Sequence, residues 1–193
     1  MQNIIEQFMR YFTPNISEKS IESFSSIVSL KQFPKGKIII KQGQIPSNFY
    51  IIKSGVARSC IKNTEEKEHI RTLYTPMSTV GALSSLIKKN ASNATYDCLT
   101  DCELFEGDFS TFLNLTQNNH EIALFYCKVL ESIFIRTEKR VDELALLSAT
   151  ERYIKLKEEI PEINNLIPQY HIASFLNITP VQLSRIRKKL YSI

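Results

Sequence analysis

The spacing of apolar residues changes twice along the chain, and each change marks a different kind of predicted element. Over residues 1–29 apolar side chains recur at three- and four-residue steps, which predicts two helices, the second capped by Ser17. From residue 30 to about 106, short runs rich in β-branched and aromatic residues alternate with turns such as Gln42-Gly43 and Ser54-Gly55. Several short strands at this spacing predict a compact β-barrel or sandwich.

From about residue 109 the pattern becomes helical again, and neither glycine nor proline interrupts residues 108–160. A three- and four-residue stripe predicts one helix over residues 118–147, which would be roughly 45 Å long. Since a single small barrel cannot cover such a helix, we expect the stripe to contact a second copy of the chain. The residues expected in this dimer contact are Tyr126, Val129, Ile133 and Leu144. The alternative is that the stripe packs wholly against the chain's own barrel.

The segment Ser148-Ala149-Thr150-Glu151 predicts a break in the helix and the start of another. Thr150 is a suitable cap for a helix that runs to about Glu159, and Pro161 ends it. We therefore divide the chain into three parts. These are an effector domain over residues 1–117, the dimerisation helix over 118–147 and a C-terminal domain over 148–193.

The C-terminal part has the pattern of a short helix, a tight turn and a second helix. Asn177 lies at the turn, where a left-handed backbone is tolerated better by asparagine than by most residues. Thr179 and Gln182 are spaced as a capping box, and Pro180 suits the first position of the second helix. This combination predicts a helix-turn-helix.

The second helix of this motif has two distinct faces. Leu183, Ile186 and Leu190 share one face and are expected to be buried. Small, polar and basic groups on the opposite face and at the helix start are what major-groove readout requires. The candidate DNA-contacting residues are Thr179, Val181, Gln182, Ser184, Arg185 and Lys188. An ordinary amphipathic surface helix with a basic end is the alternative.

Charge strengthens the DNA hypothesis only because it is unevenly distributed. The chain has 193 residues, 24 Lys and Arg, 20 Asp and Glu, and a net charge of +4. Residues 148–193 carry a net charge of +3, and Arg185, Arg187, Lys188 and Lys189 lie close together there. A basic block at the end of a nearly neutral chain is typical of a nucleic-acid contact.

Composition excludes several other classes. No run of 18 apolar residues and no signal peptide is present, so we expect a cytoplasmic protein without a membrane partner. The four cysteines are expected to be reduced, with no metal site and no other cofactor. No Ser/His/Asp grouping or pair of carboxylates indicates catalysis, so we expect no enzyme and no catalytic residues.

In order along the chain, these features resemble the Crp/Fnr (cyclic-AMP receptor protein/FNR) family of bacterial transcription regulators. The resemblance covers nearly all of the sequence, through Ile40-Lys41-Gln42-Gly43, Thr150-Glu151-Arg152 and the helix-turn-helix. Residues 144–153 and 167–190 are similar to the variants common in Bacteroidetes. The resemblance implies an α+β fold made of a jelly-roll cyclic-nucleotide-binding-like β-domain, a long dimerisation helix and a helix-turn-helix domain.

The segment that corresponds to the family's nucleotide pocket departs from the family pattern. Members that bind cyclic nucleotides carry Gly-Glu-Leu, whose glutamate accepts from the ribose hydroxyl, and an arginine about ten residues later for the phosphate. This chain has Gly81-Ala82-Leu83, and the arginine position falls near Ser92. The resemblance places a degenerate pocket at Gly81, Ala82, Leu83, Ser92, Asn93, Thr95 and Thr137. We expect cyclic AMP not to bind unless Lys88 or Lys89 turns inward.

Two functions follow from these observations. The first is a homodimeric transcription regulator that binds an inverted repeat in double-stranded DNA, with RNA polymerase left open as a further partner. The second is a small-molecule-sensing or protein-interaction module whose helix-turn-helix does not read DNA. The exposed positions expected for Arg185 and Lys188 favour the first.

Overall fold

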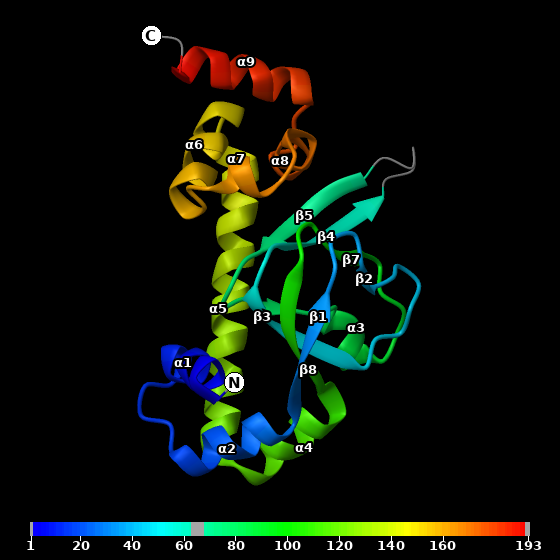
Figure 1. Ribbon diagram of the computed structural model, residues 1–193, viewed down its shortest axis with the longest axis vertical. Coiled ribbons are helices and arrows are strands. Elements are labelled where there is room, and N and C mark those ends of the chain that lie inside the picture. The colour runs from blue at the N-terminus through cyan, green and yellow to red at the C-terminus, as the bar shows by residue number, and fades with distance from the viewer. Residues whose placement is uncertain (1, 63–67, 192–193) are drawn as a thin grey trace.

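The computed structural model describes residues 2–62 and 68–191 and has one long helix to which every other part is attached (Figure 1). This helix is α5 (His120–Leu146). The β-domain lies along its N-terminal half together with α1 (Gln2–Phe12), α2 (Glu18–Ser26) and α4 (Phe109–Asn118). The C-terminal helices are gathered at its other end: α6 (Ala149–Glu159), α7 (Ile163–Leu166), α8 (Gln169–Phe175) and α9 (Pro180–Tyr191).

The β-domain consists of two four-stranded antiparallel sheets. The first has the order β1-β8-β3-β6, with β1 (Val28–Phe33), β8 (Cys102–Asp108), β3 (Asn48–Ser54) and β6 (Thr79–Val80). The second has the order β2-β7-β4-β5, with β2 (Ile38–Ile40), β7 (Thr95–Cys98), β4 (Ala57–Lys62) and β5 (Glu68–Tyr74). A short helix, α3 (Leu83–Lys88), follows β6. The expected jelly-roll domain, long helix and C-terminal helix-turn-helix are confirmed.

The sequence pattern misplaced the start of the first strand. Val28 continues the helical spacing of α2, but in the structure it begins β1, which pairs with β8 from Val28↔Gly107 to Phe33↔Cys102. The helix stops at Ser26, and Ile27 is its C-cap. Pairing with a distant strand therefore overrides the local spacing.

The joint between α5 and α6 is formed by side-chain caps. Asn119 caps α5, since its Oδ1 accepts from the backbone N–H of Ile122 at 3.2 Å. Ser148, not Thr150 as the sequence pattern indicated, caps α6 through a capping box with Glu151. The Glu151 carboxylate accepts from the Ser148 N–H at 2.8 Å, and this satisfies a donor that would otherwise lack a partner at the helix start.

One apolar cluster joins the C-terminal helices to the β-domain. Tyr153, Leu156, Ile172 and Leu183 are buried in it, and so are Val56 and Leu99 from the β-domain. The core of the C-terminal helices is therefore continuous with one edge of the β-domain. The division of the chain at residues 117 and 147 stays a prediction. Within residues 2–62 and 68–191 no helix is long and apolar enough to cross a membrane.

Candidate functional sites

The helix-turn-helix has the turn chemistry that the sequence predicted. Asn177 adopts a left-handed backbone with φ of 56°. The N–H of Ile178 donates to the carbonyl of Ala173 at 3.0 Å across the turn, and Ala173 is fully buried where the second helix approaches. The capping box is also present: Gln182 Oε1 accepts from the Thr179 N–H at 2.8 Å, and Thr179 Oγ1 accepts from the Gln182 N–H at 3.2 Å.

The six predicted DNA-contacting residues are all exposed at the start and along one side of α9. They are Thr179, Val181, Gln182, Ser184, Arg185 and Lys188. Thr179 and Gln182 are occupied by the capping box, so their structural role is to begin the helix. Of the apolar face, only Leu183 is fully buried, whereas Ile186 is half-buried and Leu190 is exposed. The expectation that all three are buried is therefore wrong for Leu190, which lies beyond the contact with α8.

The surface around α9 has an unopposed positive charge. Residues 163–191 contain no aspartate or glutamate. Arg185, Arg187, Lys188 and Lys189 have no carboxylate partner among the described residues. Because α9 lies at the far end of the molecule from the β-domain, this positive face is open to a large polyanion (Figure 1).

The first helix of the motif, α8, covers the free edge of the second sheet. Ser174 Oγ accepts from the N–H of Ile70 in β5 at 3.0 Å and lies 3.2 Å from the carbonyl oxygen of Glu68, to which it donates. An edge strand otherwise presents unpaired backbone groups, so α8 satisfies two of them. The backbone carbonyls at the end of α8 accept hydrogen bonds from two arginines. Arg140 donates to Phe175 O, and Arg152 donates to Leu176 O at 3.1 Å.

An ionic network lies beneath this contact. The Arg58 guanidinium donates to both carboxylate oxygens of Asp97, at 2.9 and 3.1 Å, and lies 3.2 Å from Glu68. Its third contact is His171 Nδ1 at 3.3 Å. Burial alone lowers the pKa of Arg58, but the bonds to Asp97 outweigh it and the pKa is raised. Burial raises the pKa of Asp97 even though Arg58 acts in the opposite direction.

His171 therefore faces the β-domain. Its ring lies against Arg58 on the inner side of α8. Burial, and then the charge of Arg58, lower the pKa of His171 to about 4, so the ring is neutral near pH 7.

The face of α5 that packs mainly on helices α1, α2 and α4 of the same chain includes three residues expected in the dimer contact. Val129 is 8% exposed and belongs to the apolar core that includes Phe8, Phe24 and Phe112. Tyr126 and Ile133 pack against this core. The Tyr126 ring lies 5.2 Å from that of Phe112. All three side chains thus contact their own chain, and their place in a dimer contact stays a prediction. Leu144 alone of the four remains exposed.

A different stripe of α5 is mostly uncovered. Residues at alternating three- and four-residue steps run along it: Cys127, Leu130, Phe134, Thr137, Val141 and Leu144. All are exposed except the half-buried Leu130, and Leu130 and Thr137 also line the cavity described below. Phe134 is 67% exposed and Val141 is 60% exposed. Both stripes have helical spacing, so periodicity alone does not say which one packs against the chain's own helices α1, α2 and α4.

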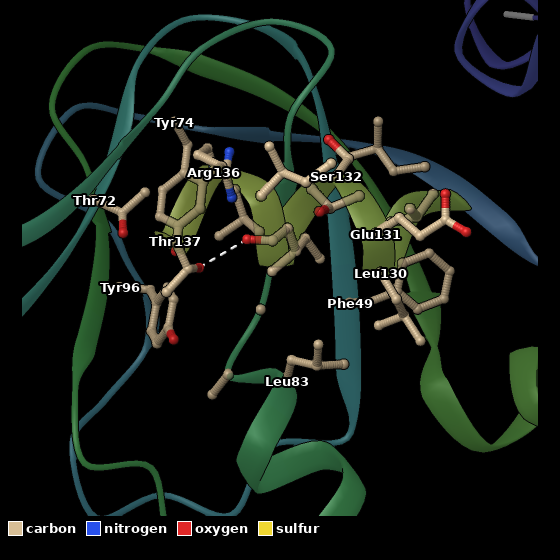
Figure 2. A pocket seen from close by; sticks show the side chains of 18 of the residues that line it. Phe49, Thr72, Tyr74, Leu83, Tyr96, Leu130, Glu131, Ser132, Arg136 and Thr137 are labelled. Atoms are coloured by element: carbon tan, nitrogen blue, oxygen red, sulfur yellow. Dashed lines mark hydrogen bonds between the residues drawn. The ribbon is translucent and has the colours of Figure 1, made fainter. Parts of the chain in front are cut away.

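A cavity of about 1020 Å³ lies between the β-domain and α5 (Figure 2). Of the residues expected there, Gly81, Ala82, Leu83, Asn93 and Thr137 line it. Ser92 and Thr95 do not. The Ser92 hydroxyl is buried and donates to the Ala94 carbonyl at 2.7 Å, while Thr95 Oγ1 accepts from the Gln42 N–H at 3.2 Å. Lys88 and Lys89 are exposed and lie outside the lining.

Two arginines that were not among the predicted pocket residues also line the cavity. Arg71 lies in β5 at a β-bulge, where the register jumps from Ser59↔Thr72 to Cys60↔Ile70. A bulge redirects a side chain, and Arg71 donates to the Tyr96 hydroxyl at 2.8 Å. Arg136 projects from α5 over the Tyr74 ring, 5.6 Å from its centroid. The sequence could have indicated Arg136, because it directly precedes Thr137, which was already expected in the pocket.

The hydroxyl groups near these arginines are held in place. Thr137 Oγ1 donates to the Ile133 carbonyl at 2.8 Å within α5, as the dashed line in Figure 2 shows. Burial raises the pKa of Tyr96 to about 12, although Arg71 acts to lower it. The Tyr96 hydroxyl is therefore protonated at neutral pH, and its oxygen accepts from Arg71.

Comparison with known proteins agrees with this architecture. Residues 30–119 match the family described as cyclic nucleotide-binding domain. No curated protein sequence matches the chain.

Solved structures match it over most of its length. The c-di-GMP-responsive global regulator CLP of Xanthomonas campestris is 16% identical at a TM-score of 0.71, with 91% of this chain and 92% of that chain covered. FixK2 from Bradyrhizobium japonicum is 14% identical at a TM-score of 0.74, with coverages of 86% and 85%. A protein from Eubacterium rectale, described as a transcriptional regulator of the Crp/Fnr family, is 16% identical at 0.70, with coverages of 91% and 84%. At these identities the likeness concerns the fold.

Proposed function

We propose that this chain, which contains a cyclic nucleotide-binding domain and has the fold of the Crp/Fnr transcription regulators, is a homodimeric regulator that reads double-stranded DNA through α9. The observation that carries the proposal is the exposed basic face of α9, which meets no carboxylate among the described residues. Phosphate contacts need such cations, and base readout needs donors on the first turns of a helix that fits the major groove.

Arg185 and Lys188 have different roles in this proposal. Arg185 lies in the second turn of α9, where a guanidinium can donate two hydrogen bonds to guanine. Lys188 lies one turn further along, where an ammonium meets the phosphate backbone as a point charge. Arg185 therefore supplies specificity, and Lys188 supplies mainly affinity.

Selection from a random-sequence duplex pool, followed by anisotropy on the enriched site, tests the proposal. We expect an inverted repeat with half-site centres about 34 Å apart. Arg185→Ala then weakens binding by about 1–3 kcal/mol and relaxes preference at one position of each half-site. Lys188→Ala weakens binding to all sequences about equally and lowers the salt slope by about one. Lys37→Ala, an exposed lysine of the β-domain, is the control and changes neither quantity.

The dimer contact is the uncovered stripe of α5. Two copies of this stripe, Cys127 to Leu144, have the alternating spacing with which helices pack knobs into holes. Exposed side chains such as Phe134 and Val141 are costly to leave in water, and a second helix covers them. Such a C2 dimer presents two copies of α9, as an inverted repeat requires.

Sedimentation of Phe134→Glu tests this contact, since two like charges would face each other in the seam and the variant is expected to be monomeric. Ile135→Glu is the matched control. Ile135 is 61% exposed, close to the 67% of Phe134, but it lies outside the three- and four-residue stripe, so this variant stays dimeric. A wild-type protein that is monomeric at micromolar concentration contradicts the proposed seam.

The alternative function is a small-molecule-sensing or protein-interaction module in which the helix-turn-helix only supports the fold. In that case no duplex is enriched in the selection, and Arg185→Ala and Lys188→Ala behave like the Lys37→Ala control. The exposed basic face of α9 favours DNA over this alternative, because its four cations meet no carboxylate among residues 2–62 and 68–191.

A further inference from the structure

We propose that the cavity beside α5 binds an amphipathic organic carboxylate, with its head group at Arg71 and Arg136 and its apolar body against Phe49, Leu83 and Leu130. The inference rests on the proposed function in one respect, since it names the class of effector for the regulator. The binding itself is measured on the protein without DNA, so that failure of one proposal is distinguishable from failure of the other.

The head-group end is defined by two arginines that lack an acidic partner. Within the part of the chain that the structure describes, Arg71 bonds only the Tyr96 hydroxyl, and Arg136 only stacks on the Tyr74 ring. A guanidinium offers five donors, so both side chains have donors to spare. Figure 2 shows Thr72, Tyr74, Tyr96, Arg136 and Thr137 gathered at one end of the cavity.

The acidic residues of the cavity do not neutralise these arginines. Glu131, Glu143 and Glu159 also line it, but each is engaged elsewhere. Glu131 pairs with Lys128 at 2.8 Å, Glu143 with Lys155 at 2.9 Å, and Glu159 with Lys139. Two cations of the cavity are thus left for an anion that the chain itself does not provide.

Away from the arginines, apolar side chains make up much of the lining. Figure 2 shows Phe49 and Leu130 together on the other side, next to Glu131, and Leu83 apart from them; Ile51 and Ile133 line the cavity as well. The Glu131 carboxylate is paired with Lys128. Burial of apolar carbon against such a wall contributes roughly 0.8 kcal/mol per CH₂ group. A cavity of about 1020 Å³ is at the large end of ligand sites and is sufficient for a chain of ten or so carbons.

The arrangement discriminates between kinds of ligand. A cyclic nucleotide with its phosphate at the two arginines would leave its ribose hydroxyl without the carboxylate that Ala82 replaces. A cation would face the two arginines. A molecule with one anionic end and one apolar end matches both ends of the cavity.

Fluorescence titration with 11-(dansylamino)undecanoate tests the inference. We expect saturable binding to the wild-type protein. Arg71→Gln and Arg136→Gln each weaken it about tenfold to a hundredfold, as expected when a hydrogen bond between charged groups is removed. Arg136→Lys keeps the positive charge, so this variant is expected to lose less affinity for the probe than Arg136→Gln. Lys88→Gln, a cation just outside the cavity, leaves the affinity unchanged and is the matched control.

The methyl ester of the same probe separates the head group from the chain. The ester is expected to bind the wild-type protein at least about tenfold more weakly and to be indifferent to Arg136→Gln. Equal affinity of acid and ester, or equal affinity of wild type and both arginine variants, overturns the inference. Circular dichroism and the melting temperature of each variant show that a loss of binding is not a loss of fold.

Discussion

Removing the Arg58 charge tests whether the network between the β-domain and α8 stabilises the protein through Asp97. Arg58→Met keeps the apolar stem and deletes the guanidinium. The side chains of Arg58 and Asp97 are each only 12% exposed, so the variant leaves a carboxylate in a poorly hydrated place without its cation. Glu68 is 46% exposed and contributes little, because water replaces its partner.

The magnitude follows from the fate of Asp97. Breaking a buried ion pair from one side costs about 3–5 kcal/mol, and a carboxyl that can take up a proton escapes part of that cost. We therefore expect the free energy of unfolding near neutral pH to fall by about 3 kcal/mol. Lys37→Met, at an exposed lysine, controls for the loss of a surface cation.

The pH dependence identifies the carboxyl responsible. Burial already raises the pKa of Asp97, and loss of Arg58 raises it further above the value of about 3.9 in the unfolded chain. A carboxyl whose folded pKa is raised destabilises the fold increasingly as pH rises through that pKa, and not at all below its unfolded pKa. The deficit of Arg58→Met is therefore small at about pH 4.5 and complete at about pH 8.

Urea unfolding at fixed protein concentration measures these differences. Combining Arg58→Met with Asp97→Asn removes the orphaned carboxyl, so the double variant is expected to be more stable than the sum of the single losses by about 1–3 kcal/mol. The same deficit at both pH values, or additivity of the two substitutions, would refute the role assigned to Asp97.

Two further predictions concern the cavity and one turn. Cyclic AMP up to millimolar concentration should give no saturable heat in calorimetric titration. Ala82 replaces the carboxylate that would accept from the ribose hydroxyl, and loss of such a charge-assisted contact costs about 2–5 kcal/mol. Saturation at micromolar concentration would contradict this. Gly55→Ala should lower the free energy of unfolding by about 3 kcal/mol or more. Gly55 has φ of +91°, and an added Cβ would lie 2.3 Å from the Asp101 carbonyl oxygen. A chemical denaturation midpoint equal to that of the wild type would contradict the second prediction.

The sequence predicted those parts of the molecule whose signals are local. The turn at Asn177 and the box between Thr179 and Gln182 depend on residues within a few positions, and both are present in the structure. The exposure of Arg185 and Lys188 follows from helical spacing around the buried Leu183.

The features that the sequence missed depend on contacts between distant segments. Which stripe of α5 packs against its own chain is decided by aromatic packing between helices, for example of Tyr126 against Phe112 of α4, and not by periodicity. Arg71 enters the cavity because of a bulge between β4 and β5, which is a property of strand pairing. His171 is neutral because it is buried and lies beside the charge of Arg58, which belongs to a strand 113 residues earlier.

The shared apolar cluster of Val56, Leu99 and the C-terminal helices has a consequence for how this chain can change over generations. A set of C-terminal helices taken from another protein would have to present the same surface to Val56, to Leu99 and to the edge of β5. Substitutions at Val56 or Leu99 would in turn require compensation near Tyr153 or Leu156. The β-domain and the C-terminal helices are therefore expected to evolve together, and exchange of residues 148–193 as a ready-made module would leave a hydrophobic gap in the part that remained.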